Sequence, residues 1–160
     1  MDDYSDIFGR AAERAYETDR LTLRVLKPSE AEIALQYHLR NREFLRAWEP
    51  ARSEDFYSLS HQEQLLREYL DQTASRSALR FWIFKKDEPD RTIGSIGFSN
   101  IVWGGFLSCF LGYKLDEAEI NRGYMTEAIR KGIEIVFQEC GLHRIEANII
   151  PRNLRSLRVA

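Results

Sequence analysis

The segment Asn121-Arg122-Gly123-Tyr124-Met125-Thr126 combines residue types that suit the binding of a phosphate or pyrophosphate group. It lies between an expected strand and an expected helix, where a glycine lets the backbone approach a ligand closely. The N–H groups of a first helical turn attract anions, and Arg122 adds a positive charge beside them. The sequence contains neither the P-loop pattern nor the dinucleotide-binding pattern G-x-G-x-x-G. The alternative is that Gly123 only relieves a tight turn.

The distribution of charge also favours an anionic ligand late in the chain. The 160 residues have a formal net charge of −2, without the large basic excess typical of nucleic-acid binding. Residues 121–160 nevertheless hold seven basic and four acidic side chains, a local net charge of +3 that leaves −5 for the rest. We therefore expect an anionic small molecule, if one binds, to contact this final quarter.

The first half of the chain predicts two helices and one strand that could support this segment. Residues 1–19 have a weak amphipathic pattern, typical of a short helix or a loosely held tail, and residues 20–26 alternate as a strand. The capping-box pattern S-x-x-E occurs at Ser29 and again at Ser60, and each occurrence predicts a helix start. The first helix is expected over about 30–39.

The second half predicts an antiparallel meander followed by a crossover. Strands are expected over 79–84, 92–101 and 106–115, joined by short turns. A helix over 123–140, with Gly141 as its C-cap, leads to a strand over 143–150 and a basic helix over 152–160. A strand–helix–strand unit with this spacing predicts parallel pairing between the strands ending at Leu115 and Ile150.

Composition predicts a single domain in the cytoplasm. The chain is 44% hydrophobic and 30% charged, as in soluble globular proteins. The largely apolar stretch 101–113, which contains a Gly-Gly pair, is shorter than the roughly 20 residues that a membrane-spanning helix needs. The start Met1-Asp2-Asp3-Tyr4 lacks the basic and apolar stretches of a secretory signal.

Metal and disulfide chemistry are not expected. Cys109 and Cys140 are too few for a disulfide framework and are interpreted as reduced core thiols. The three histidines are scattered, and no Cys/His cluster has metal-ligand spacing.

At the phosphate-binding segment the sequence resembles the GCN5-related N-acetyltransferase (GNAT) superfamily. The family pattern Q/R-x-x-G-x-G/A falls on Ile120-Asn121-Arg122-Gly123-Tyr124-Met125 and departs from it at both ends. The continuation Thr126-Glu127-Ala128 is similar to the ribosomal-protein-alanine N-acetyltransferase branch. Further matches to that branch occur in order along the chain: Thr18-Asp19-Arg20-Leu21, Phe44-Leu45-Arg46-Ala47-Trp48-Glu49-Pro50, Gly97-Phe98-Ser99-Asn100, Cys109-Phe110-Leu111-Gly112-Tyr113, His143-Arg144-Ile145-Glu146-Ala147-Asn148 and Asn153-Leu154-Arg155-Ser156.

The resemblance implies an α+β fold: a mixed, mostly antiparallel sheet flanked by helices, with a parallel β-α-β crossover at the cofactor site. The chain would be one N-acetyltransferase domain over 1–160, with 1–19 as an N-terminal extension. Similar proteins continue into two more strands after the last helix. The resemblance therefore implies that the C-terminal strands are missing here, with an open sheet edge and exposed apolar residues.

The resemblance also implies roles for individual residues. Acetyl-CoA would lay its pantetheine arm along Tyr113-Lys114-Leu115 and its pyrophosphate on the N–H groups of 121–126. Asn153 would contact the cofactor and Ser156 would protonate the departing thiolate. The alternatives are that Asn153 only caps a helix and that the Ser156 hydroxyl is only solvated.

The resemblance points to no single residue as the general base. The position at which a related enzyme type has a glutamate is Asn148 here, so Glu146 and Glu49 are the candidates, with structural roles as the alternative. A protein α-amine with a pKa of ~7.8 is ~14% neutral at pH 7, whereas a lysine at ~10.4 is ~0.04% neutral. The difference amounts to about 3.5 kcal/mol, so an N-terminal acceptor needs only a weak base.

The functional interpretation is direct acetyl transfer from acetyl-CoA to the N-terminal amine of a protein, with a ribosomal protein as the leading candidate. The alternatives are a small-amine acetyltransferase, acting on an antibiotic or polyamine, and a non-catalytic ribosome-assembly or regulatory factor. We expect a monomer or homodimer without direct nucleic-acid or membrane binding.

Overall fold

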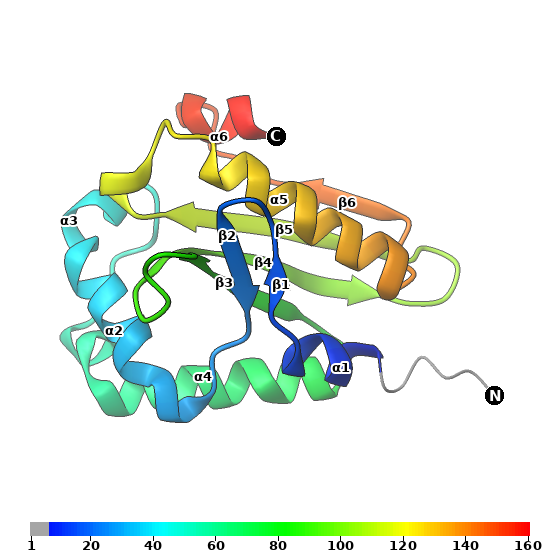
Figure 1. The fold of residues 1–160 in the computed structure, drawn as a ribbon, viewed down its shortest axis with the longest axis horizontal. Helices are drawn as coiled ribbons and strands as arrows, with labels where there is room; N and C mark the ends of the chain where they lie inside the picture. The colour runs from blue at the N-terminus through cyan, green and yellow to red at the C-terminus, as the bar shows by residue number, and fades with distance from the viewer. Residues whose placement is uncertain (1–6) are drawn as a thin grey trace.

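The computed structural model describes residues 7–160, so the part of the expected N-terminal helix over 1–6 lies outside the described residues. The sheet has six strands in sequence order, and every neighbouring pair is antiparallel except the last, β5–β6, which is parallel. This arrangement confirms the predicted mixed sheet, its meander and its crossover (Figure 1). The strands are β1 (Tyr16–Glu17), β2 (Leu21–Arg24), β3 (Leu79–Lys85), β4 (Thr92–Val102), β5 (Ser108–Leu115) and β6 (Arg144–Ala147).

Helices cover both faces of the sheet. On one face, α1 (Ile7–Glu13) and α5 (Tyr124–Glu134) pack on a core that includes Phe81. On the other face, α2 (Ala31–Arg40) and α4 (Leu59–Ala74) pack on a core that includes Trp82. Because successive side chains of a strand point to opposite faces, β3 contributes to both cores. The strand predicted over 79–84 is therefore present, but burial on both faces replaces the expected period of two.

Several short helical turns connect the main elements. They are the 3-10 turns Pro28–Glu30, Glu54–Tyr57 and Glu117–Glu119, the short helix α3 (Arg42–Leu45) and the π-helical turn Ile135–Glu139 that extends α5. Gly141 then adopts a positive φ of 72°, as expected of a residue that ends a helix.

Both predicted capping boxes were wrong, although both helices exist. Ser29 lies inside the turn Pro28–Glu30, where the Glu30 carboxylate accepts from the Lys27 N–H at 2.9 Å and binds Arg24. Proline favours the first turn of a helix, so that turn begins before Ser29. The cap of α4 is Ser58, whose side chain accepts from the His61 N–H at 3.2 Å. Ser60 lies already inside the helix.

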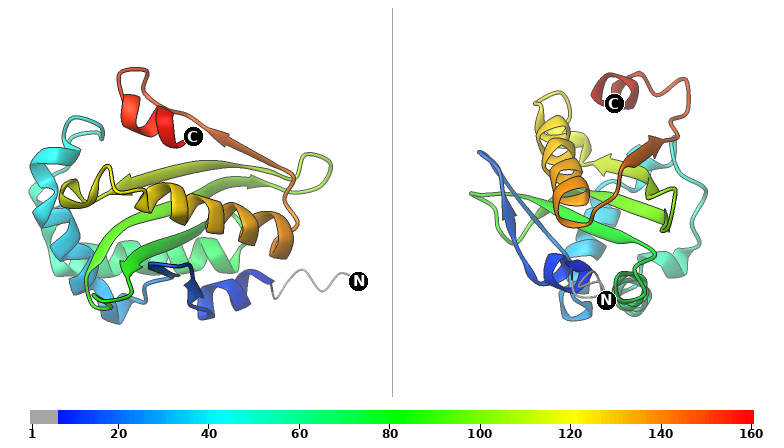
Figure 2. Two further views of the ribbon diagram at one scale, coloured as in Figure 1. Left: turned by 45° about the horizontal axis from the view of Figure 1, so that its top comes forward. Right: turned by 90° about the vertical axis from the view of Figure 1, so that its right-hand side faces the viewer.

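Strands β5 and β6 separate where the candidate site begins. Their pairing ends at Leu111 and Ala147, so residues 112–115 of β5 have no partner in β6. The chain after β6 turns away from the sheet and folds back as α6 (Leu154–Val159) (Figure 2). Among residues 7–160, β6 is the last strand of the sheet, and Ile150, Leu154 and Leu157 are exposed, as the resemblance implied.

Candidate active site

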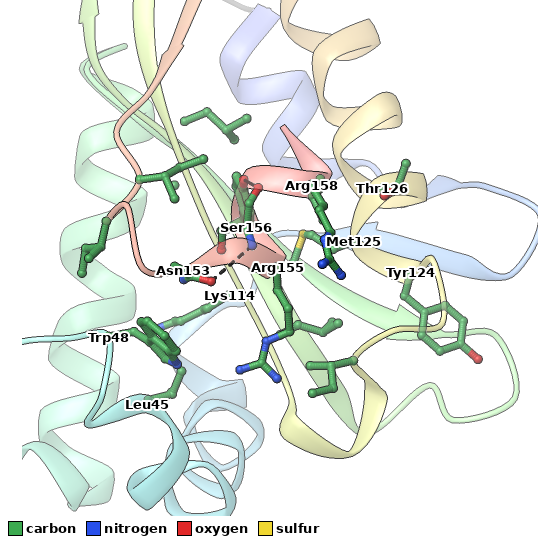
Figure 3. Close-up of a pocket in the computed structure, with 18 of the residues that line it drawn as sticks. Leu45, Trp48, Lys114, Tyr124, Met125, Thr126, Asn153, Arg155, Ser156 and Arg158 are labelled. Atoms are coloured by element: carbon green, nitrogen blue, oxygen red, sulfur yellow. Dashed lines mark hydrogen bonds between the residues drawn. The ribbon is translucent and has the colours of Figure 1, made fainter.

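A cavity of about 410 Å³ lies in the opening between β5 and β6. One side is formed by the start of α5 and by residues 112–115 of β5, which pair with β4 but not with β6 and are called the unpaired end of β5. The 148–153 loop and α6 form the other side (Figure 3). The α3 region closes one end with Phe44, Trp48 and Glu49. Most of the predicted site residues line this single cavity: Glu49, Tyr113, Lys114, Leu115, Asn121, Gly123, Tyr124, Met125, Thr126, Asn153 and Ser156.

The start of α5 presents backbone donors to the cavity. Gly123 is the N-cap residue with φ +79°, and no side chain caps this helix. The first N–H groups of an α-helix have no acceptor within the helix, so those of 124–126 remain available for a ligand. Asn121 also has a positive φ, 61°, which few residues other than glycine adopt. Gly123 therefore makes a tight turn and also begins a helix that faces the cavity. The anion-binding interpretation and the tight-turn interpretation of Gly123 are thus compatible.

Arg20 braces this turn from outside the cavity. Its Nη1 donates to the Arg122 carbonyl at 3.0 Å, its Nε binds Glu127 at 2.9 Å, and its guanidinium lies 4.4 Å from the Tyr124 ring centroid. Sequence reasoning gave Arg20 no role, although it noted the segment around it. The contacts hold the Arg122 carbonyl and the first turn of α5 in place.

The Arg122 side chain does not line the cavity. Its guanidinium is 58% exposed and lies 3.5 Å from Glu119. Its charge therefore acts on the cavity only from a distance, while its backbone belongs to the turn.

Tyr113 joins β5 to α6 across the opening. Its hydroxyl donates to the Ser156 carbonyl at 2.7 Å, and burial raises the pKa of the phenol. The phenol therefore stays protonated at neutral pH. This bond fixes the distance between the unpaired strand and the helix above it.

Asn153 and Ser156 lie where α6 begins. The Asn153 Oδ1 accepts from the Ser156 N–H at 3.2 Å, which is the helix cap considered from sequence (Figure 3). Capping and ligand contact are not exclusive, because both side chains also line the cavity. This hydrogen bond thus holds Asn153 and Ser156 in place relative to each other.

Arg155 and Arg158 of α6 add two cationic side chains to the cavity wall (Figure 3). Sequence reasoning did not select them individually, although the local charge of residues 121–160 pointed to this part of the chain. The Arg155 guanidinium also lies 5.2 Å from the Phe44 ring centroid, so it bridges toward the α3 region.

The two candidate bases occupy different environments. Glu49 lines the cavity, is 23% exposed, and its Oε1 lies 3.2 Å from the Lys114 Nζ. Glu146 is 50% exposed on β6, pairs with Arg144 at 3.0 Å and does not line the cavity. The structure thus brings Glu49, but not Glu146, to the other site residues.

Lys114 is unusual among the cations here. Burial lowers its pKa to about 8, although the neighbouring Glu49 acts in the opposite direction. A substantial fraction of this amine is therefore neutral at mildly alkaline pH.

Within residues 7–160, no group of three or more His, Cys, Asp or Glu side chains could hold a metal ion. Cys109 and Cys140 are buried and unpaired with one another, as expected. In the same described part of the chain, no helix has the length and apolarity to span a membrane.

Comparison with known proteins agrees with this geometry. Residues 20–160 match the family model described as an acetyltransferase (GNAT) domain. The chain is 36% identical to the probable N-acetyltransferase YjcK of Bacillus subtilis, over 86% of this chain and 75% of that protein. It is also 36% identical to the ribosomal protein uS5-alanine N-acetyltransferase of Escherichia coli, over 87% of this chain and 71% of that protein.

A solved structure is similar over nearly the whole fold. The ribosomal-protein-S5-alanine acetyltransferase of Vibrio fischeri superposes with a TM-score of 0.85 at 32% identity, over 91% of this chain and 79% of that one. With the family model and two curated relatives in agreement, the chain belongs to the GNAT family of N-acetyltransferases.

Proposed function

We propose that this protein transfers the acetyl group of acetyl-CoA to the N-terminal α-amine of a protein, with a ribosomal protein as the first candidate. The observation that carries the proposal is the single cavity that joins the uncapped start of α5, the unpaired end of β5 and Ser156. These are a phosphate site, a strand edge and a proton donor, arranged along one opening.

The residues of the cavity fit acetyl-CoA. The N–H groups of 124–126 suit its pyrophosphate, and Arg155 and Arg158 supply positive charge on the opposite wall. The free backbone groups of Tyr113-Lys114-Leu115 suit the amides of the pantetheine arm, in the manner of an added strand. The cofactor supplies a thioester carbonyl that an amine can attack.

Ser156 and Glu49 would carry out the two proton transfers of the reaction. The amine nitrogen bonds to the carbonyl carbon, the carbon–sulfur bond breaks, and the sulfur needs a proton as it leaves. Ser156 lines the cavity, and its hydroxyl would donate that proton and regain one from water. Glu49 would accept a proton from the amine, directly or through water, while Lys114 holds its carboxylate in position.

An α-amine acceptor suits such a modest base. About one seventh of an α-amine is neutral at pH 7, against well under a thousandth of a lysine side chain. The Escherichia coli and Vibrio fischeri relatives, named for alanine of ribosomal protein S5, support the same class of acceptor.

The test is acetylation of a short peptide that has a free N-terminal alanine and one internal lysine. We expect the acetyl group on the α-amine, located by tandem mass spectrometry, and no product from the same peptide with a blocked N-terminus. Acetylation of the lysine, or of a polyamine in preference to the peptide, would contradict the proposal.

A further inference from the structure

A second cavity lies beside the first, on the α4 face of the sheet. Its volume is about 270 Å³, and four residues line both cavities: Glu49, Gly112, Tyr113 and Lys114. The unpaired end of β5 is therefore the boundary between the two. A molecule in the second cavity can meet the contents of the first only at this boundary.

Two glycines shape the second cavity. Arg80 of β3 pairs with Gly97 of β4, and Gly97 pairs with Gly112 of β5, so the three residues form one row across the sheet. A Cβ atom at Gly112 would meet nothing within 4 Å, and one at Gly97 would lie 3.3 Å from the Arg80 Nη2. The Arg80 guanidinium therefore lies over Gly97, and the open space at Gly112 forms a trough beside it.

The Arg80 guanidinium has unused hydrogen-bonding capacity. Its Nη1 donates to the Ser95 hydroxyl at 3.3 Å, and its flat face lies 4.5 Å from the Tyr69 ring centroid. Its Nε is buried without a hydrogen-bond partner, and no carboxylate of residues 7–160 forms an ion pair with it. A guanidinium presents paired donors that match the two oxygens of a carboxylate.

The charge of the second cavity is positive. Arg52, Arg80 and Lys114 line it, against the single carboxylate of Glu49, which already pairs with Lys114. Burial and then the positive charges of Lys114, Arg52 and Arg80 lower the pKa of the neighbouring His38. The imidazole therefore stays neutral and adds nothing to the positive charge of the cavity.

We propose that the second cavity holds the acceptor and selects one that carries a carboxylate close to its amine, with Arg80 as the residue that binds the carboxylate. This inference rests on the proposed function, because it assigns the substrate class of the same site. The acceptor amine would lie at the boundary near Glu49. The carboxylate has two possible sources, an acidic side chain in the first residues of a peptide or the α-carboxylate of a small amino acid.

The experiment compares kcat/KM for C-terminally amidated peptides Ala-Asp-Ala-Ala, Ala-Ala-Ala-Ala and Ala-Lys-Ala-Ala. We expect the aspartate peptide to exceed the alanine peptide at least about tenfold, and the lysine peptide to be the poorest. Dialanine with a free carboxylate and its amide form the second arm, which tests the other source. Preference for the free carboxylate in this arm alone would assign the site to small amino acids.

Variants separate this site from the rest of the fold. Arg80→Gln should abolish the preference while leaving acetyl-CoA affinity unchanged, and Arg52→Gln, at an exposed position, should reduce it. Arg67→Gln is the matched control, because Arg67 is exposed on α4 and lines neither cavity. Equal rates for acidic and neutral acceptors in both arms, or a preference that survives Arg80→Gln, would overturn the inference.

A failure of the proposed function gives a different result. If no peptide is acetylated, the same acceptors are titrated calorimetrically into the protein saturated with CoA. Tighter binding of the carboxylate-bearing member of each pair, lost in Arg80→Gln, would still support the anion site. Equal binding within each pair would overturn it.

Discussion

The middle of the sheet and the unpaired end of β5, called the edge below, differ in how completely neighbouring elements cover them. At β3, both faces are covered: Phe81 is 0% and Trp82 3% exposed, each in its own core. At the end of β5, residues 112–115 lack a β6 partner, and the α6 residues above them include Leu154 at 61% exposure. Burial stabilises the middle, whereas the end of β5 has backbone groups on its β6 side without a partner strand. A ligand that forms hydrogen bonds with those backbone groups gains binding free energy that no strand of the sheet uses.

The sharpest contrast between the two regions is in stability. Phe81→Ala should lower the free energy of unfolding by about 3–5 kcal/mol, because it leaves a cavity in a core covered on all sides. Leu154→Ala, at the exposed edge, should change it by no more than about 0.5 kcal/mol. Urea-induced unfolding measures both. Comparable losses would show that the α6 region is part of the core and would remove the contrast.

Acetyl-CoA binding, in contrast to the free energy of unfolding, should depend on residues at the edge. Gly123→Glu should weaken acetyl-CoA binding at least ~100-fold, because it adds a negative charge at the start of α5, where the pyrophosphate is proposed to bind. Gly123→Ala is the matched control, since it shares the strain of a side chain at φ +79° but adds no charge. Isothermal titration calorimetry measures both affinities. Similar affinities for the two variants would place the pyrophosphate elsewhere.

Chemistry should be separable from binding within the edge region. Ser156→Ala should lower kcat by ~10- to 100-fold and leave the acetyl-CoA Kd unchanged, because only the proton donor is removed. Steady-state rates with the alanine peptide, together with calorimetry, provide the two values. An unchanged kcat would remove Ser156 from the mechanism.

The smallest expected effect is a titration at the boundary of the two cavities. Since burial lowers the pKa of Lys114 to about 8, its charge should be lost as the pH rises through that value. The ion pair with Glu49 should then be present below pH 8 and lost above it. Glu49→Gln should lower the midpoint further, because the carboxylate favours the charged amine. NMR of the Lys114 side chain follows the titration, and a midpoint near the usual lysine value would contradict the described burial.

The same contrast explains what could be predicted from sequence. The meander over β3, β4 and β5 was predictable because turns at Pro89 and at Gly104-Gly105 separate segments rich in aromatic and β-branched residues. The helix starts were not, because the S-x-x-E pattern at Ser29 is overridden by the turn at Pro28 and by the bonds that Glu30 makes to Arg24 and Lys27. Strand β1 has two residues and is too short to leave a periodic signal.

At the site, the local sequence identified individual residues but not the residues that they contact in the fold. The turn at Gly123 was found from its own residues, whereas its brace, Arg20, contacts Glu127 from 107 positions away. The trough beside Arg80 depends on the register that aligns Gly97 with Gly112, which the composition of each strand alone does not reveal. Glu146 and Glu49 were equivalent as sequence candidates, and only the fold separates them.

The central claim is that the uncapped start of α5 and the unpaired end of β5 together form one cofactor site. An acetyl-CoA titration followed by amide NMR tests it residue by residue. The largest shift changes are expected at 112–115 and 121–126, with saturation at the same cofactor concentration for both segments. Changes confined to one segment, or concentrated elsewhere in the chain, would contradict the account.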